Sequence, residues 1–492
     1  MPRAVALRRP RLRLAQTFAA LVYGDVDTAE ALLAGADGDD PDESFSPSVG
    51  EAASLLVNLP AGFAIGRAWL AYLRGEPVAM AAYAAQARGR LREGQLMLES
   101  IYRLNLALAD WLGGKLPDAE RGFADLVERW RSMGESSLAA RSCGFIGQVQ
   151  RDQGRLDDAF RTYTQLVGIA EDPRQPRPPV AAYGYVGMAE VAYQRDELAD
   201  ALRHASLGIA RGRQLSESEP LAGGLVILAW IRQANGDRAG AVAALDEAQG
   251  VAPSPAVADL LNPVPAQRAR LLLAQGDVAS GVRWASERGL SPDDEPSYLR
   301  EQEYLVLVRI LLAQGEPAAA LALLDRMHGP AVGQERTGSV IEMLALRALA
   351  LAAEGSSAQA MDVMREALTL GRPQGYVRVF ADEGAAMASL VARADGVPAD
   401  YLARVRRACG IGGVGPGRSD QRPAQPLVDP LTGRELEVLA LLAAGTPNQA
   451  IADQLVVTVD TVKKHVTHVL AKLSASNRTE AVARARHLGL LG

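Results

Sequence analysis

Apolar residues recur at intervals of three and four along most of this chain, a spacing that gathers them on one side of a helix. One such set comprises Leu104, Leu108, Trp111 and Leu112. Short turn segments, most of them containing a glycine, separate these helical runs. The successive turn residues are Gly24, Gly75, Gly114, Gly154, Asp196, Gly236, Gly276, Gly315 and Gly355. After a first interval of 51 residues, they recur every 39 to 42 residues.

A mostly small residue stands five positions after each turn residue. The members of this second series are Ala29, Met80, Ala119, Ala159, Ala201, Ala241, Gly281, Ala320 and Ala360. A fixed period with a fixed internal pattern is typical of stacked repeats. Glycine ends one helix in the left-handed conformation, and the small residue lets the next helix approach closely. The pattern predicts nine helix-turn-helix pairs over residues 10–372, stacked as a curved all-α solenoid that occupies residues 1–372.

The repeats resemble tetratricopeptide repeats, although their period exceeds the ~34 residues of the standard form. The longer spacing resembles the MalT-like subgroup of these repeats. Because repeat proteins bind partners on extended concave surfaces, we expect a small ligand, a peptide or a protein partner there; a pure scaffold is the alternative. The tryptophans are expected to pack between helices rather than to form a ligand cage. They include Trp69, Trp130, Trp230 and Trp284.

Three stretches depart from the repeat pattern. The acidic insertion at residues 36–58 predicts a solvated loop rather than a metal site, because its carboxylates lack metal-ligand spacing. Residues 373–409 predict a helical cap, and the Gly- and Pro-rich residues 410–430 predict a flexible linker. Residues 412–419 of this linker imitate a phosphate-binding loop, but they follow a helix instead of a buried strand. We therefore expect no nucleotide cofactor.

Residues 431–492 contain clearly marked helix starts. Thr432 and Glu435 have the spacing of a capping box, and Thr446 stands before a proline at the first helical position. Thr458 and Ser476 precede the next two helical runs. Four helices are predicted near residues 433–444, 447–455, 459–473 and 477–488. The short turn between the second and third is typical of a helix-turn-helix.

The third of these helices has two different sides when its residues are placed at ~100° intervals. The apolar side comprises Val462, Val466, Val469 and Leu473, and the polar side comprises Lys463, Lys464, Thr467, His468 and Ala471. Lysines reach phosphates or guanine, and small residues let the backbone come close, so the polar side suits a DNA major groove. A solvated helix face is the alternative.

The charge distribution favours the DNA interpretation. Six residues from Thr461 to Leu491 are lysine or arginine and one is acidic, whereas the whole chain has a net charge of −6. Basic charge is therefore concentrated where phosphate contacts are needed.

The terminal stretch closely resembles the LuxR-type helix-turn-helix. The matching residues are Leu431, Thr432, Arg434, Glu435, Glu437, Val438, Leu439, Gly445, Asn448, Ile451, Ala452, Leu455, Thr461, Val462, Lys463, His465, Lys472, Leu473, Arg478, Thr479, Glu480 and Ala481. The resemblance implies that the third helix reads bases and that the last helix, residues 478–488, mediates dimerisation. It places base contacts at Lys463, Lys464 and Thr467, and phosphate contacts at Thr461, Lys472 and Arg478. His465 lies near the apolar side and is expected to be structural.

The repeats and residues 375–384 together resemble the large MalT-like regulators of this family. Those regulators carry a nucleotide-binding module before the repeats, and other relatives carry a receiver domain. Neither pattern occurs in this sequence, so ATP-driven self-assembly is not expected. The chain is then either a natural short form or part of a longer regulator.

Composition and motif content narrow the function further. No apolar run reaches the ~18 residues of a membrane helix, and the arginine-rich start lacks the apolar region and cleavage site of a signal peptide. Cys143 and Cys409 form neither a disulfide framework nor a zinc pattern, which favours a reducing interior. No metal-ligand, nucleophile or paired acid-base motif is present, so we expect no catalytic residue, no metal and no enzymatic activity.

These patterns together predict a cytoplasmic transcriptional regulator. It would bind double-stranded promoter DNA as a homodimer, contact RNA polymerase, and sense a ligand or protein partner through the concave face of its repeats. The alternative is a protein-interaction scaffold whose terminal domain serves only to dimerise.

Overall fold

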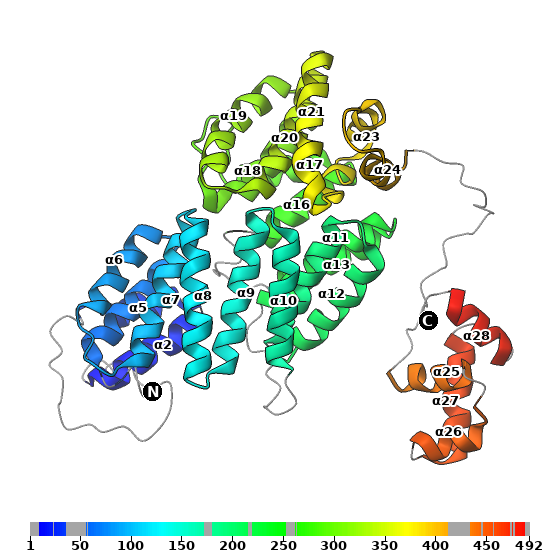
Figure 1. Ribbon diagram of the computed structural model, residues 1–492, viewed down its shortest axis with the longest axis horizontal. Helices are drawn as coiled ribbons and strands as arrows, with labels where there is room; N and C mark the ends of the chain where they lie inside the picture. The colour runs from blue at the N-terminus through cyan, green and yellow to red at the C-terminus, as the bar shows by residue number, and fades with distance from the viewer. Residues whose placement is uncertain are drawn as a thin grey trace. The chain divides into compact units, whose positions relative to one another are not determined.

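The computed structural model divides into two units, Met1–Gly412 and Gly413–Gly492. It describes residues 9–22, 24–35, 56, 58–171, 180–214, 219–251, 261, 263–411, 433–443, 446–455, 457–472, 475 and 478–487. All regular structure in these ranges is helical, which confirms the all-α fold class (Figure 1). The predicted phosphate-loop imitation, nearly all of the predicted linker, and most of the acidic insertion lie outside the described residues. Of the described helices, none is both long and apolar enough to cross a bilayer.

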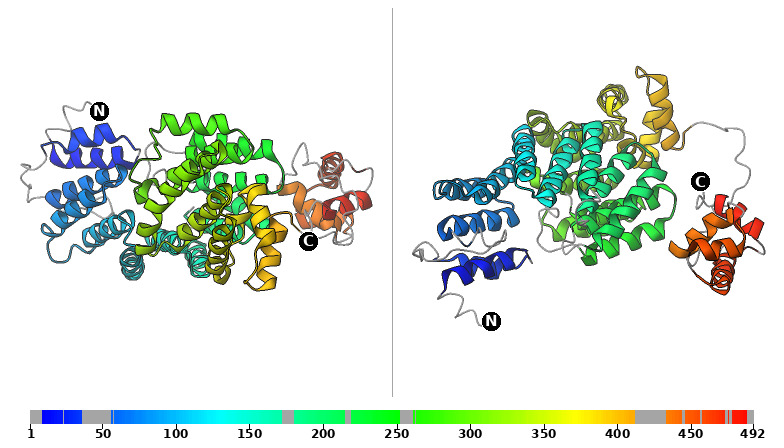
Figure 2. Two further views of the ribbon diagram at one scale, coloured as in Figure 1. Left: turned by 90° about the horizontal axis from the view of Figure 1, so that it is seen from above. Right: turned by 60° about the horizontal axis from the view of Figure 1, so that its bottom comes forward.

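The first unit is built from helix pairs. Among its described residues these pairs are α2 (Pro10–Val22) with α3 (Val26–Leu33), α5 (Leu59–Leu73) with α6 (Pro77–Arg88), α7 (Leu96–Leu112) with α8 (Leu116–Ser132), α9 (Ser136–Asp152) with α10 (Leu156–Ala170), α11 (Ala181–Gln194) with α12 (Leu198–Gly212), α13 (Glu219–Ala234) with α14 (Arg238–Val251), α16 (Val264–Ala274) with α17 (Val278–Glu287), α18 (Glu301–Gln314) with α19 (Pro317–Gly333), and α20 (Thr337–Ala353) with α21 (Ser357–Gly371). Figure 2 shows successive pairs stacked beside one another, as the repeat pattern predicts.

The nine predicted turn residues all have positive φ, between 63° and 94°. Gly315 illustrates the reason: at φ 79° it ends α18, and its N–H bonds back to the carbonyls of Leu311 and Leu312. The small residues five positions later are all buried, because each lies where the second helix of a pair packs on the first. The turn residue and the small residue five positions later therefore mark the same point in each repeat, and together they define its period.

Asp196 is the one turn residue of the series that is not glycine, and it holds φ at 63°. Its Oδ1 accepts a hydrogen bond from Arg378 Nη1 at 3.2 Å, across 182 residues of sequence. Glycine adopts this backbone conformation more readily than aspartate does. At this position the aspartate instead provides a hydrogen-bonded ion pair with Arg378.

The repeats end in a short helical segment, which we call the cap: η3 (Arg372–Gln374), α22 (Arg378–Ala381), α23 (Gly384–Arg393) and α24 (Ala399–Ala408). The cap packs on α20 and α21 and also contacts the middle repeats. Val377 N donates to Gln194 O at 2.8 Å, and Arg404 Nη2 donates to Arg195 O at 3.0 Å. The stack of helix pairs, which we call the superhelix, therefore turns back on itself: α9 contacts α20, and α11 contacts α22.

The second unit contains α25 (Gly433–Ala443), α26 (Asn448–Leu455), α27 (Val459–Lys472) and α28 (Arg478–His487). One apolar cluster joins the first three of these helices, and a second joins α25, α27 and α28. The fully covered members include Val438, Ile451, Val462, Val469 and Ala481. These described helices agree closely with the four predicted from sequence.

Candidate functional site

Helix α27 is the predicted DNA-contacting element, and its start is fixed by local hydrogen bonds. Thr458 caps it, because Thr461 N donates to Thr458 Oγ1 at 3.2 Å. The preceding turn is held by Val457 N, which donates to Ala452 O at 3.0 Å. These bonds set the angle between α26 and α27, as a helix-turn-helix requires.

The two sides of α27 differ as the sequence predicts. Val462 and Val469 are fully buried, and Val466 packs against the same core. Lys463, Lys464, Thr467 and His468 are exposed on the opposite side. Leu473 and the side chain of Ala471 lie outside the described residues, and His465 is half-buried. The helix therefore presents a polar surface made mainly of cationic and hydroxyl groups.

The three predicted base-contacting residues lie together on this exposed surface. Thr467 Oγ1 donates to Lys463 O at 3.0 Å, which keeps its side chain close to the helix. Lys463 Nζ lies 3.2 Å from Asp460 Oδ1, with the two side chains 64% and 85% exposed. Such an exposed ion pair contributes little to stability, so Lys463 can exchange Asp460 for water or a DNA phosphate at little cost. Lys464 makes no contact with another charged group among the described residues.

The predicted phosphate-contacting residues have different surroundings. Thr461 remains at the start of α27, its hydroxyl 2.8 Å from that of Thr458. Lys472 Nζ pairs with Glu435 Oε2 at 2.9 Å, where the side chains are only 16% and 4% exposed. Arg478 Nη2 donates to the carbonyls of Leu442 and Thr446 at 3.1 and 2.9 Å.

Lys472 and Arg478 therefore bind helices of the unit together. The periodicity of α27 could not reveal this, because both partners come from α25 and the segment after it. Glu435, predicted as the acid of a capping box, has Lys472 as one partner. The capping box itself stays a prediction, because Thr432 lies outside the described residues. Phosphate contacts by Lys472 and Arg478 stay a prediction that would require these bonds to rearrange.

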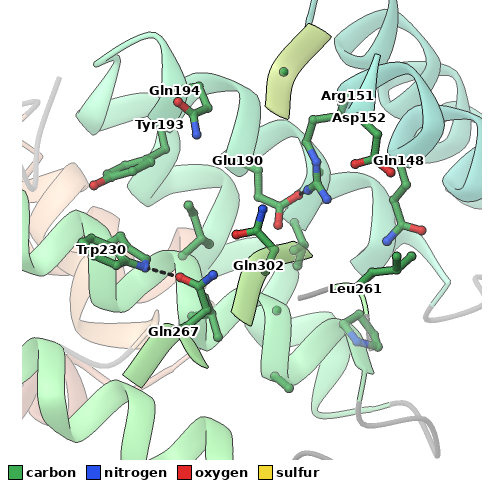
Figure 3. A pocket seen from close by; sticks show the side chains of 18 of the residues that line it. Gln148, Arg151, Asp152, Glu190, Tyr193, Gln194, Trp230, Leu261, Gln267 and Gln302 are labelled. Atoms are coloured by element: carbon green, nitrogen blue, oxygen red, sulfur yellow. Dashed lines mark hydrogen bonds and ion pairs between the residues drawn. The ribbon is translucent and has the colours of Figure 1, made fainter. Parts of the chain in front are cut away.

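The first unit contains a cavity of about 280 Å³ inside the closed superhelix (Figure 3). Residues from α5, α7, α9, α10, α11, α13, α16, α18, α20 and the cap line it. The aromatic members of the lining are Tyr72, Trp111, Tyr163, Tyr183, Tyr193, Trp230 and Tyr376. The sequence prediction that Trp230 only packs between helices is therefore incomplete: its ring also lines the cavity, and its Nε1 donates to Gln267 Oε1 at 2.9 Å.

Charged groups in the cavity lining are largely paired. Arg151 and Glu190 form an ion pair at its centre, beside Gln302 (Figure 3). Asp152 accepts hydrogen bonds from Trp111 Nε1 and from the hydroxyl of Tyr298, at 3.2 and 3.1 Å. Burial raises the pKa of Asp152 above its ordinary value, and the nearby Arg151 only partly offsets this.

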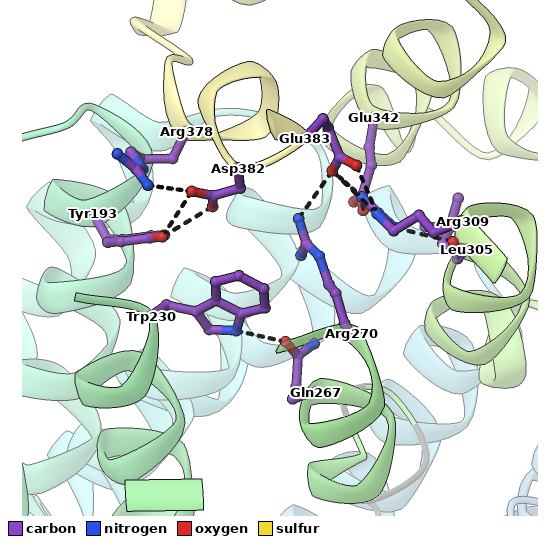
Figure 4. Close-up of polar contacts among 10 residues, drawn as sticks. All are labelled: Tyr193, Trp230, Gln267, Arg270, Leu305, Arg309, Glu342, Arg378, Asp382 and Glu383. Atoms are coloured by element: carbon purple, nitrogen blue, oxygen red, sulfur yellow. Dashed lines mark hydrogen bonds and ion pairs between the residues drawn. The ribbon is translucent and has the colours of Figure 1, made fainter. Parts of the chain in front are cut away.

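A second set of charged groups joins the cap to the repeats (Figure 4). Asp382 pairs with Arg378 and accepts a bond from the hydroxyl of Tyr193 at 2.9 Å. Burial and the nearby Asp382 raise the pKa of Tyr193 well above its ordinary value, so the phenol stays a donor. The same set contains a second cluster, in which Arg309 pairs with Glu342 at 2.7 Å and with Glu383 of the cap at 2.6 Å.

The described residues include no group of three or more His, Cys, Asp or Glu side chains that could hold a metal ion. The cavity offers paired ions, amides and aromatic rings, and the surface of α27 offers exposed lysines.

Comparison with known proteins gives two family matches. Residues 61–395 match the family described as "MalT-like TPR region", and residues 429–485 match "Bacterial regulatory proteins, luxR family". The transcriptional regulatory protein LiaR of Bacillus subtilis is 49% identical over 55 residues, which cover 11% of this chain and 26% of LiaR. The response regulator protein VraR of Staphylococcus aureus is 43% identical over 65 residues, 13% of this chain and 31% of VraR.

The chain thus matches these two curated relatives over about a quarter to a third of their length. A solved Rap protein complexed with Competence and Sporulation Factor aligns with a TM-score of 0.50 at 11% identity, covering 75% of this chain and 99% of that one. At that identity the likeness concerns the fold alone. By the family match over most of its length, this chain belongs to the MalT-like TPR family, and it carries a C-terminal helix-turn-helix domain of the luxR family of bacterial regulatory proteins.

Proposed function

We propose that this protein regulates transcription by binding double-stranded promoter DNA through α27. The observation that carries the proposal is the exposed group Lys463, Lys464 and Thr467 on a helix whose other side is buried in the unit's core. In this proposal these three residues contact bases, and Thr461 contacts phosphate at the helix start. Lys472 pairs with Glu435, and Arg478 bonds the carbonyls of Leu442 in α25 and Thr446 after it, so both residues stabilise the packing that positions α27.

The same proposal extends to assembly and regulation. The protein would act in the cytoplasm as a homodimer joined through α28, contact RNA polymerase at the promoter, and sense a ligand or protein partner through its repeat unit. The dimer role of α28 follows the resemblance of residues 478–488 to the LuxR type. Sensing is supported by the cavity, whose polar and aromatic lining is suited to holding a small ligand.

The test uses the full chain and duplexes selected from a randomised pool. Binding is measured by fluorescence anisotropy over a series of salt concentrations. Each phosphate contact contributes about 0.9 to the slope of log affinity against log salt. The double variant K463A/K464A is expected to weaken binding about 10- to 100-fold and to flatten that slope.

The matched control is K115A. Lys115 belongs to the first unit, where its side chain is 67% exposed and pairs with Asp110 at 3.5 Å. This variant should leave affinity and slope unchanged. The rival function, a scaffold that only dimerises, predicts no salt-dependent DNA binding by the wild-type chain. Equal affinity and slope for wild type and K463A/K464A would also refute the proposed DNA surface.

A further inference from the structure

Three amide side chains in the cavity lining make no hydrogen bond within the described residues. They are Gln148 of α9, Gln194 of α11 and Gln302 of α18. The Oε1 atoms of Gln148 and Gln194 are buried without a partner. A buried amide that lacks hydrogen bonds destabilises a fold, and most such groups in native proteins are satisfied.

Other glutamines of the same unit show the contrast. Gln267 also lines the cavity, but its Oε1 accepts from Trp230 at 2.9 Å. Outside the cavity, Gln150 donates to Glu120 and accepts from Thr162, both at 2.8 Å. Gln148 and Gln194 therefore differ from these two glutamines, and both line the cavity, whereas a further buried amide without a partner among the described residues, Asn105 Nδ2, lies outside it.

A fourth polar group without a partner, the hydroxyl of Tyr163, also belongs to the lining. The ring is 1% exposed and lies between two glycines of neighbouring helices. A Cβ at Gly147 would lie 2.4 Å from the ring, and a Cβ at Gly187 would lie 2.2 Å from it. Because Gly147 and Gly187 have no side chain, the Tyr163 ring fits between the two helices, and the close packing holds it in place.

The chemistry of this lining indicates what it binds. Most of its charges are already paired, as in Arg151 with Glu190 and Asp382 with Arg378, and Asp152 accepts hydrogen bonds from Trp111 and Tyr298. The lining therefore favours a neutral ligand. A primary amide presents an N–H donor and a C=O acceptor side by side, which matches another amide edge in two hydrogen bonds. At about 280 Å³, the cavity is close to the lower end of the ~300–1,000 Å³ range of ligand sites.

We propose that the cavity binds a small molecule with amide edges, either a di- or tripeptide or a nucleoside, through Gln148, Gln194, Gln302 and the hydroxyl of Tyr163. This names the ligand class for the sensing role and rests on the proposed function. The cap contributes Tyr376, Val379 and Asp382 to the same lining. A bound ligand would therefore join the cap to α9, α11 and α18, and would stabilise the closed superhelix by mass action.

The experiment uses the full chain and two probe mixtures. One is a mixture of di- and tripeptides, and the other contains adenosine, guanosine, cytidine and uridine. Thermal melting detects binding, and calorimetry with the active component gives its Kd. We expect one mixture to raise Tm, and expect Q148L and Q194L each to weaken binding about 10-fold or more, the loss of roughly one good hydrogen-bonded contact.

The apo proteins provide the decisive comparison. Because these amides have no partner to lose, Q148L and Q194L should melt at or above the wild-type Tm without ligand. The control Q165L changes an exposed glutamine of α10 and should leave the Kd unchanged.

A response to peptides alone identifies a peptide bond as the ligand edge, and a response to nucleosides alone identifies a base edge. A response to neither mixture, an unchanged Kd in both cavity variants, or a fall of several degrees in their apo Tm would overturn the proposal. Anisotropy with DNA on the same samples separates the two claims. DNA binding without any probe response refutes only the ligand site, whereas a probe response without DNA binding refutes only the regulator.

Discussion

Arg309 is the buried cation that links the cap to the last repeats, and its removal tests how the superhelix is held closed. Its side chain is 7% exposed, and its partners Glu342 and Glu383 are 14% and 7% exposed. Its Nε donates to both Glu383 oxygens at 3.1 and 3.0 Å, and its Nη1 donates to Leu305 O at 3.1 Å. R309M keeps much of the volume but leaves two buried carboxylates without this partner.

Removing one partner of a buried ion pair costs about 3–5 kcal/mol, because the remaining charge stays desolvated. Arg270 still pairs with Glu383 at 3.3 Å, so the lower part of that range is expected. For the first unit, which extends to Gly412, an unfolding entropy of about 2.1 cal/mol/K per residue converts a loss of about 3–4 kcal/mol into a Tm decrease of roughly 3.5–4.5 °C.

The assay follows the melting of the repeat unit in the full chain by circular dichroism. The control R268M breaks an exposed pair, Arg268 with Asp246 at 3.0 Å, and should lower Tm by about 1 °C or less. The double variant R309M/E342Q neutralises Glu342, the carboxylate whose ion pair with Arg309 is lost, and should recover part of the loss. A decrease below about 1 °C for R309M would show that the buried cluster does not hold the cap, and would refute the reasoning.

Two further predictions concern the cavity wall. Because burial raises the pKa of Asp152, the proton bound in the folded state stabilises the fold below the ordinary value of 3.8, and this stabilisation is lost as pH rises through the folded-state pKa. The Tm of D152N relative to wild type should therefore increase from about pH 4 to about pH 7, and a difference independent of pH would contradict this. G187A places a Cβ 2.2 Å from the Tyr163 ring, and this overpacking should lower the free energy of unfolding by about 1–3 kcal/mol, measured by urea unfolding. The control G168A adds a Cβ in open space and should leave that free energy unchanged or raise it. Equal stabilities of the two variants would refute the packing argument.

Local chemistry determined much of the DNA-binding surface. The apolar and polar sides of α27 follow from helical periodicity alone, so Val462 and Val469 could be predicted buried, and Lys463, Lys464 and Thr467 exposed. The partners of Lys472 and Arg478 could not be predicted in this way. They lie on or just after α25, and helical spacing says nothing about contacts between helices that are distant in the sequence.

The sequence by itself determined the pattern of each repeat: a turn residue with positive φ, a buried small residue five positions later, and helices throughout. Each of these depends on conformational preferences and spacing within one repeat. Only the tertiary structure decided that the superhelix turns back on itself, since Arg378 with Asp196 and Val377 with Gln194 are contacts made across about half the unit. That closure creates the cavity and places Gln148, Gln194 and Gln302 in its lining. Three helices supply one glutamine each, so no single repeat could mark the site.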